Sequence, residues 1–149
     1  QEAKSPFGAT LIVGGQIQGR DPRLFLVYPA GNFIEASDDS PFFQSGETKY
    51  GRPILVRAFD PDMSFENAVK LLLVSFDSTI RANLAGGTLF LDEIGELPLD
   101  MQVYEADSFA ITEQQRVDKD DPYFQSISDG WGDALRNAFQ SLPDFNFKT

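Results

Sequence analysis

Apolar side chains recur every three or four residues along 64–84, SFENAVKLLLVSFDSTIRANL, as they do on one face of a helix. The members of this stripe are Phe65, Val69, Leu72, Phe76 and Ile80. Ser64 comes directly before it, where its hydroxyl can accept a hydrogen bond from an N–H of the first turn. Glu66 follows at the end of the helix that favours negative charge. The pattern therefore predicts a helix over 64–84.

The middle of this helix is apolar on more than one side. Leu71, Leu73 and Val74 widen the stripe until few polar positions remain. A helix that is hydrophobic over so wide a face is usually buried on several sides. We therefore expect it to belong to a helical layer, with a sheet on one side and another element or a second subunit on the other.

Three short apolar runs occupy the first part of the chain. We predict strands at 9–18, 24–28 and 32–36, separated by the turn sequences GRDP and PAG. Short strands joined by tight turns form an antiparallel meander. The Gly14-Gly15 pair in the first strand indicates a bulge or a close backbone approach.

The next stretch, 46–58, predicts a helix, although Gly51 and Pro53 interrupt it. Because proline suits the first turn of a helix, we expect this helix to begin near Arg52.

The region after the central helix predicts two strands and a helical end. Residues 101–107 and 109–117 read as partner strands. Helical character begins at Pro122, and the glycines on either side of Trp131 predict a break before a final amphipathic helix at 132–142.

The order of strands, helices, strands and helix favours one α+β or layered α/β domain with antiparallel sheets, spanning 1–149. A chain of 149 residues, 42% of them hydrophobic, can bury a real core. No apolar run reaches the roughly 20 residues of a membrane span. The net charge of −11, from 12 basic and 23 acidic residues, argues against nucleic acid or an anionic membrane as a partner.

The chain contains neither cysteine nor histidine. This excludes disulfides, thiol nucleophiles, a Ser-His-Asp triad and the usual zinc sites. The remaining chemistry uses Ser or Thr with an amine, carboxylates, or a bound nucleotide. We expect no metal and no cofactor, and the lack of cysteine is compatible with the cytoplasm, where we expect the protein to act.

Several segments resemble the C-terminal part of the Anbu family of bacterial proteasome-type peptidases. The most specific are GNFIEA, GETKYG and SFDSTIRANL, in that order, and the likeness extends over roughly 8–84 and 97–147. The resemblance implies the αββα layered Ntn-hydrolase fold of proteasome β subunits, here its C-terminal part, with antiparallel sheets flanked by helices. It also implies assembly into a homo-oligomer through the helices, and a peptide or protein substrate.

The chemistry implied by this family is that of a threonine protease. An N-terminal Thr attacks with its hydroxyl, and its own amine or a nearby Lys takes the proton, so no histidine is needed. Residue 1 here is Gln1, and no catalytic residue is identified in the chain. The resemblance places Gly46 and Glu47 at a turn beside the nucleophile and Asn83 near a supporting carboxylate and serine, which makes these three the candidate active-site support. We expect the chain as given to be an inactive C-terminal portion.

Plainer interpretations apply to several of these residues. Glu47 is more simply a first-turn acid stabilised by a helix dipole, and Lys49 a solvated lysine. Asp77 is expected as a polar group on the helix surface or at an interface. Trp131 is expected to pack rather than to stack on a ligand.

A second resemblance concerns GGTLFLDEIGELPLDMQ, 86–102, which is similar to the Walker B region of enhancer-binding AAA+ ATPases. In that motif Asp92 would assist Mg²⁺ and Glu93 would polarise the attacking water. An ATP site also needs GxxxxGK[ST], but Gly14 to Gly19 is followed by Arg20 and Asp21. Without 85–96 the peptidase pattern would run on, so we interpret 85–96 as an insertion or graft whose two acids are more simply solvated.

Three hypotheses remain. The chain is the C-terminal portion of a proteasome-type peptidase subunit, an AAA+ ATPase fragment, or a non-catalytic assembly protein with the same fold. The first accounts for most of the chain and is the one we carry forward.

Overall fold

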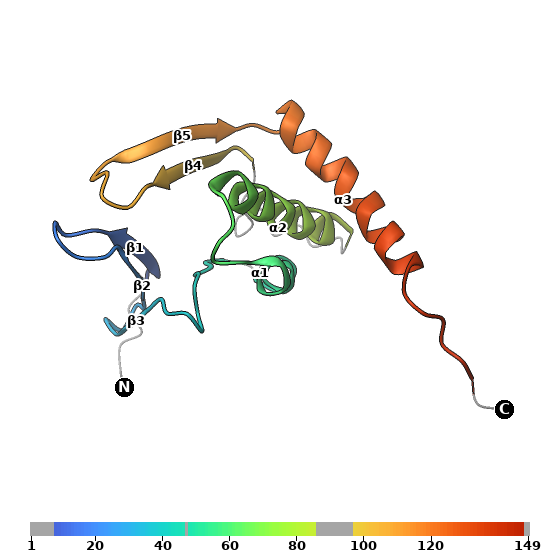
Figure 1. Cartoon of the computed structure of the whole chain (residues 1–149), viewed down its shortest axis with the longest axis horizontal. Helices are drawn as coiled ribbons and strands as arrows, with labels where there is room; N and C mark the ends of the chain where they lie inside the picture. The colour runs from blue at the N-terminus through green and yellow to red at the C-terminus, as the bar shows by residue number, and fades with distance from the viewer. Residues whose placement is uncertain (1–7, 47, 86–96, 148–149) are drawn as a thin grey trace.

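The computed structural model describes residues 8–46, 48–85 and 97–147, with only the backbone for 83–85 (Figure 1). The elements in chain order are β1 (Leu11–Gly15), β2 (Arg23–Val27), β3 (Phe33–Glu35), α1 (Arg52–Ala58), α2 (Phe65–Ala85), β4 (Leu99–Tyr104), β5 (Ile111–Val117) and α3 (Pro122–Gln140). This order of strands, two helices, strands and helix is the one that the sequence predicts. The fold is α+β, with two antiparallel sheets and three helices in the described part of the chain.

The first sheet is the predicted meander, in the order β1-β2-β3. Gly14 pairs with Leu24 and Gly15 with Arg23 in an unbroken register, so the alternative of a bulge at the glycine pair was wrong. The close approach at this pair is made by the side chain of Leu24 on the neighbouring strand. A Cβ at Gly14 would lie 3.1 Å from Cδ1 of Leu24.

An ion pair joins the second and third strands across the sheet. Nε and Nη2 of Arg23 donate to the two carboxylate oxygens of Glu35, each at 2.6 Å. The guanidinium also lies 4.8 Å from the ring centroid of Phe25. The hydrogen bond from Arg23, opposed by a smaller desolvation effect and helped by the charge of Arg23, holds the pKa of Glu35 below its ordinary value.

The second sheet is the ribbon β4-β5, which has a bulge between Val103 and Tyr104. The predicted strand 101–107 begins earlier, at Leu99, and ends at Tyr104. It stops there because the chain turns: Asp107 and Phe109 have positive φ, and the hydroxyl of Ser108 donates to the carbonyl of Glu105.

One glutamine connects the two sheets. The side chain of Gln16, just after β1, donates to Oδ1 of Asp107 at 2.8 Å. Its Oε1 accepts from the hydroxyl of Tyr104 at 2.9 Å and from the backbone N–H of Asp107 at 2.7 Å. The loop after β4 is thereby attached to the end of β1.

The first two helices begin where the sequence predicts. Helix α1 starts at Arg52 with Pro53 in its first turn. Helix α2 starts at Phe65, after Ser64, and runs for 21 residues.

The break predicted around Trp131 is wrong, because α3 is continuous from Pro122 to Gln140. The carboxylate of Asp121 caps its first turn by accepting from the N–H groups of Tyr123 and Phe124. A glycine costs a helix only about 1 kcal/mol relative to alanine. Packing on α2 outweighs that cost at Gly130 and Gly132.

The small core lies where α2 meets the β4-β5 ribbon and α3. Leu73, Val117 and Phe124 are each 5% exposed and form its centre. On another side α2 packs on α1, where Leu55 is buried. Helix α2 is therefore covered on more than one side, as its sequence predicts.

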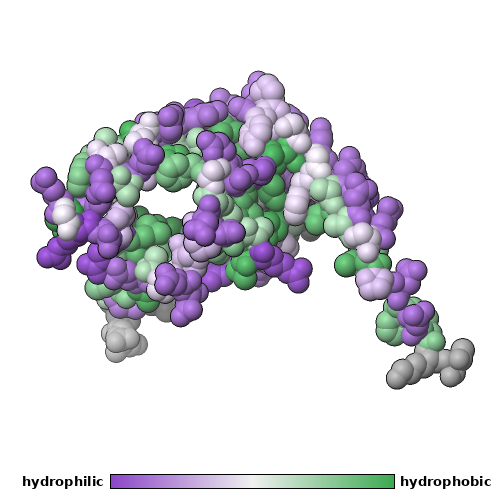
Figure 2. All heavy atoms as spheres, in the orientation of Figure 1, coloured by the Kyte–Doolittle hydropathy of each residue, from purple (hydrophilic) through white to green (hydrophobic). Residues whose placement is uncertain are grey.

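Much apolar surface stays open elsewhere. In the predicted stripe of α2, Phe65, Leu72 and Phe76 are 50%, 46% and 38% exposed, although the sequence predicts a buried face. The first sheet also exposes large apolar side chains, namely Leu11, Ile12, Val13, Phe33 and Ile34. Figure 2 shows an opening between the β4-β5 ribbon and this sheet, with hydrophobic atoms along part of its rim. In the described part of the chain, none of the helices combines the length and the hydrophobicity that crossing a bilayer requires.

Because the start of α1 packs closely on α2, adding one methyl group at Gly51 should destabilise the folded chain. Gly51 is buried, and a Cβ there would collide with Oγ of Ser75 and lie 3.1 Å from the Ser75 carbonyl oxygen. We expect Gly51→Ala to lower the free energy of unfolding by about 1–3 kcal/mol, as overpacking does.

The matched control is Gly132→Ala in α3, where the new Cβ meets only the end of Arg136 at an ordinary 3.6 Å. Alanine should stabilise that helix by about 0.5–1 kcal/mol. Urea denaturation of both variants measures the difference, and equal stabilities would show that Gly51 is not a tight contact.

The ion pair between Arg23 and Glu35 across the first sheet predicts that stability depends on pH. The pKa of Glu35 is lowered in the folded chain, so its contribution to stability is present above the ordinary glutamate pKa and is lost as the pH falls through the lowered value. Arg23→Gln should raise the pKa of Glu35 toward its ordinary value, as followed by carboxyl NMR titration. The pKa of Glu66, lowered chiefly by the hydroxyl of Ser64, should stay low in the same variant.

Candidate active site

A cavity of about 420 Å³ lies between β1, the segment 42–46, α1 and α2. Its walls are mainly apolar: Ile12, Phe42, Phe43, Leu55, Phe59, Met63, Ala68, Leu71, Leu72 and Phe76. Leu72 and Phe76 line this space, which explains their exposure on α2. The cavity is suited to an apolar side chain of a ligand.

The segment 42–46 forms the edge of the cavity and is held by its aromatic residue. The ring of Phe42 lies 5.8 Å from that of Phe59, and the guanidinium of Arg52 lies 5.9 Å from the Phe42 ring centroid. The segment ends at Gly46, which has a φ of +83°. Only glycine adopts this left-handed conformation without strain, so the turn requires a glycine here.

Few polar groups face the cavity, and they come from two elements. Ser75 and Thr79 of α2 are 4% and 8% exposed. The hydroxyl of Thr79 donates to the carbonyl of Ser75, four residues earlier, at 3.0 Å. The Oε1 atom of Gln44 is buried and accepts no hydrogen bond from the described residues.

The structure describes the predicted active-site support residues only in part. Gly46 lines the cavity, and its role beside an active site stays a prediction. Asn83 lies in α2 one helical turn after Thr79, and only its backbone is described. Glu47, Asp92 and Glu93 lie outside the described residues, so the role of Glu47 and the nucleotide site remain predictions.

The sequence analysis did not single out three of the polar residues that line the cavity, Gln44, Ser75 and Thr79. Ser75 and Thr79 interrupt the apolar pattern of α2, and this could have marked them as polar groups facing a site. Nothing around Gln44 distinguishes it from any surface glutamine, because its burial depends on the packing of α1 and α2.

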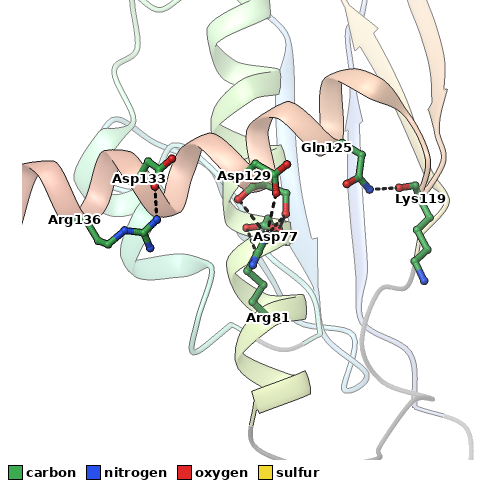
Figure 3. Close-up of polar contacts among 8 residues, drawn as sticks. Asp77, Arg81, Lys119, Gln125, Asp129, Asp133 and Arg136 are labelled. Carbon is green, nitrogen blue, oxygen red and sulfur yellow. Dashed lines mark hydrogen bonds and ion pairs between the residues drawn. The ribbon is translucent and has the colours of Figure 1, made fainter.

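Asp77 holds α3 on α2, on another side of the helix (Figure 3). Its carboxylate is 3% exposed and accepts from the hydroxyl of Ser128 at 2.5 Å and from Nε of Arg81 at 3.2 Å. Arg81 also donates to the carbonyl of Ser128 at 3.2 Å and lies 4.0 Å from Asp129. The interfacial role expected for Asp77 is confirmed.

The comparison with protein families agrees with this architecture. The model of the family described as proteasome subunit matches residues 1–90. The chain belongs to the proteasome subunit family. Its α+β architecture is accordingly of the Ntn-hydrolase type. No curated protein matches the chain.

Among solved structures, this proteasome-type chain is similar to Anbu proteins. Anbu from Hyphomicrobium sp. strain MC1 is 50% identical, with a TM-score of 0.82 over 95% of this chain and 57% of that one. Anbu, described as an ancestral beta-subunit, from Yersinia bercovieri is 45% identical, with a TM-score of 0.81 over 95% and 56%. The Anbu complex from Pseudomonas aeruginosa, described as a helical assembly, is 43% identical, with a TM-score of 0.81 over 96% and 56%. The chain thus spans a little more than half the length of these relatives.

The contact at Asp77 predicts the stability of the α2-α3 interface. Asp77→Ala leaves the hydroxyl of Ser128 without its carboxylate and should lower the free energy of unfolding by about 1–3 kcal/mol. Asp133→Ala is the control, because its ion pair with Arg136 is about 70% exposed on both sides. That variant should change stability by less than about 0.5 kcal/mol in the same denaturation experiment. Equal losses would contradict a special role for Asp77.

Proposed function

We propose that this chain is the part of an Anbu-type subunit that binds the substrate, and that the full-length subunit hydrolyses peptide bonds with an N-terminal Thr. The observation that carries the proposal is the apolar cavity, with the Gly46 turn at its edge, in a chain 50% identical to an Anbu protein.

The described residues supply recognition in this proposal. The cavity takes an apolar side chain of the peptide. In this proposal the backbone at Gly46, where no Cβ stands in the way, approaches the substrate closely and its N–H donates to the oxyanion. Support by Glu47 and Asn83 remains part of the proposal.

The nucleophile is a Thr whose own amine acts as the base. This chemistry needs neither histidine nor cysteine, the two residue types that the chain lacks. The chain covers only 57% of the Hyphomicrobium Anbu chain, so we expect this polypeptide alone not to hydrolyse peptides. The subunit acts in a homo-oligomer, as supported by the helical assembly of the Pseudomonas aeruginosa relative, and the absence of cysteine suits the cytoplasm.

The proposal predicts the behaviour of the protein as its host makes it. N-terminal sequencing should reveal a longer chain whose mature first residue is Thr, and that chain should hydrolyse fluorogenic peptides with an apolar residue before the cleaved bond. A stable full-length oligomer with no N-terminal Thr and no hydrolysis would instead support a non-catalytic assembly role.

Two glycine variants of that full-length protein test the site. Gly46→Ala and Gly19→Ala both place alanine at positive φ, +83° and +77°, and should lower stability by a similar amount, roughly 1–3 kcal/mol. Only Gly46 borders the cavity, so only its variant should lower kcat/KM, by roughly tenfold or more. Equal rates for the two variants would place the active site elsewhere.

A further inference from the structure

The end of the chain carries an unusual set of exposed apolar side chains. We define the C-terminal arm as residues 139–147, the end of α3 and the segment after it. Its four large apolar residues are highly exposed: Phe139 by 76%, Leu142 by 62%, Phe145 by 78% and Phe147 by 84%. Figure 1 shows that the C-terminal end of α3 and the arm extend away from the other elements.

The arm has a defined conformation. Helix α3 ends at Ser141, whose hydroxyl donates to the carbonyl of Ala138 at 2.7 Å, and Pro143 prevents its continuation. Beyond it, the rings of Phe145 and Phe147 meet edge to face at 4.9 Å. The two rings form one compact apolar knob.

A second apolar hollow lies between the three helices. The helix groove, of about 450 Å³, is lined by residues of α1, α2 and α3 and of the loop between the first two: Ile54, Ala58, Met63, Asn67, Lys70, Leu71, Val74, Ser126, Ile127, Gly130, Trp131 and Ala134. Trp131 is one wall of this groove, and its expected packing role stays a prediction. Lys70 is exposed at the groove, and the arm carries Asp144 beside its aromatic knob.

We propose that the C-terminal arm of one copy docks in the helix groove of a second copy, in a reciprocal exchange. This inference rests on the homo-oligomer of the proposed function, and it identifies a contact through which two copies associate. The arm leaves the far end of α3, beyond the last groove residue Ala134, and extends away from the groove of its own copy. The knob enters the groove, and the carboxylate of Asp144 approaches the ammonium of Lys70.

The area is sufficient for a stable pair. A buried aromatic side chain covers about 150–250 Å², so the two phenylalanines of the knob cover roughly 300–500 Å² per arm. In a two-fold arrangement the contact occurs twice, and each arm covers a similar area of groove. The total reaches the roughly 1,200 Å² at which specific interfaces begin.

The first test is sedimentation of the chain across a concentration series. Phe145→Ser combined with Phe147→Ser should weaken association by roughly tenfold or more, because aromatic anchors dominate such contacts. Phe33→Ser is the control, since Phe33 is 62% exposed on β3 and outside both arm and groove. Association of the arm variant at the strength of the original chain would overturn the proposal, although self-association itself would stand. A chain that is monomeric throughout would overturn both.

The second test uses the absence of cysteine from the sequence. An Asn146→Cys variant, which keeps both aromatic anchors, should form a disulfide between copies when mixed with an Ala58→Cys variant, because Ala58 lines the groove. Val56→Cys replaces Ala58→Cys in the control, since Val56 is 62% exposed on the same helix and outside the groove. Equal rates for the two partners, or an internal disulfide when Asn146→Cys and Ala58→Cys share one chain, would contradict exchange. Peptide hydrolysis is measured separately, so its failure leaves this result unaffected.

Discussion

The burial of α2 is the constraint on which the rest of the structure depends. Its apolar residues are too many for one contact, so the β4-β5 ribbon, α1 and α3 all pack around it. Asp77 fixes one of these contacts, because a carboxylate that is 3% exposed must keep its partners Ser128 and Arg81. The position of α3 therefore follows from a polar requirement as well as from hydrophobic burial.

The two hollows of the molecule share this helix. The cavity beside Gly46 and the helix groove both use residues of α2, and Leu71 lines both. Met63, in the loop before α2, also lines both. A ligand that displaces either side chain in one hollow would change the shape of the other, since packed interiors transmit small displacements. Assembly through the groove and substrate binding in the cavity would then be connected through these two side chains.

The pattern of exposed apolar surface agrees with the length of the relatives. The first sheet exposes Leu11, Val13 and Phe33, and the chain covers only 57% of the Hyphomicrobium Anbu chain, 50% identical to it. Surfaces of this kind normally belong to interfaces within or between chains.

The sequence by itself determined the order of the elements, the start of α2 after Ser64 and the start of α1 at Arg52, because spacing, caps and proline act locally. It also singled out Gly46, which lines the cavity, although the active-site role of this residue stays a prediction. Only the tertiary structure decided that α3 runs unbroken through Gly130, that Leu72 faces a cavity, and that Gln44 is buried. These outcomes depend on contacts between segments far apart in the chain, whose energies exceed the local preferences that a sequence pattern expresses.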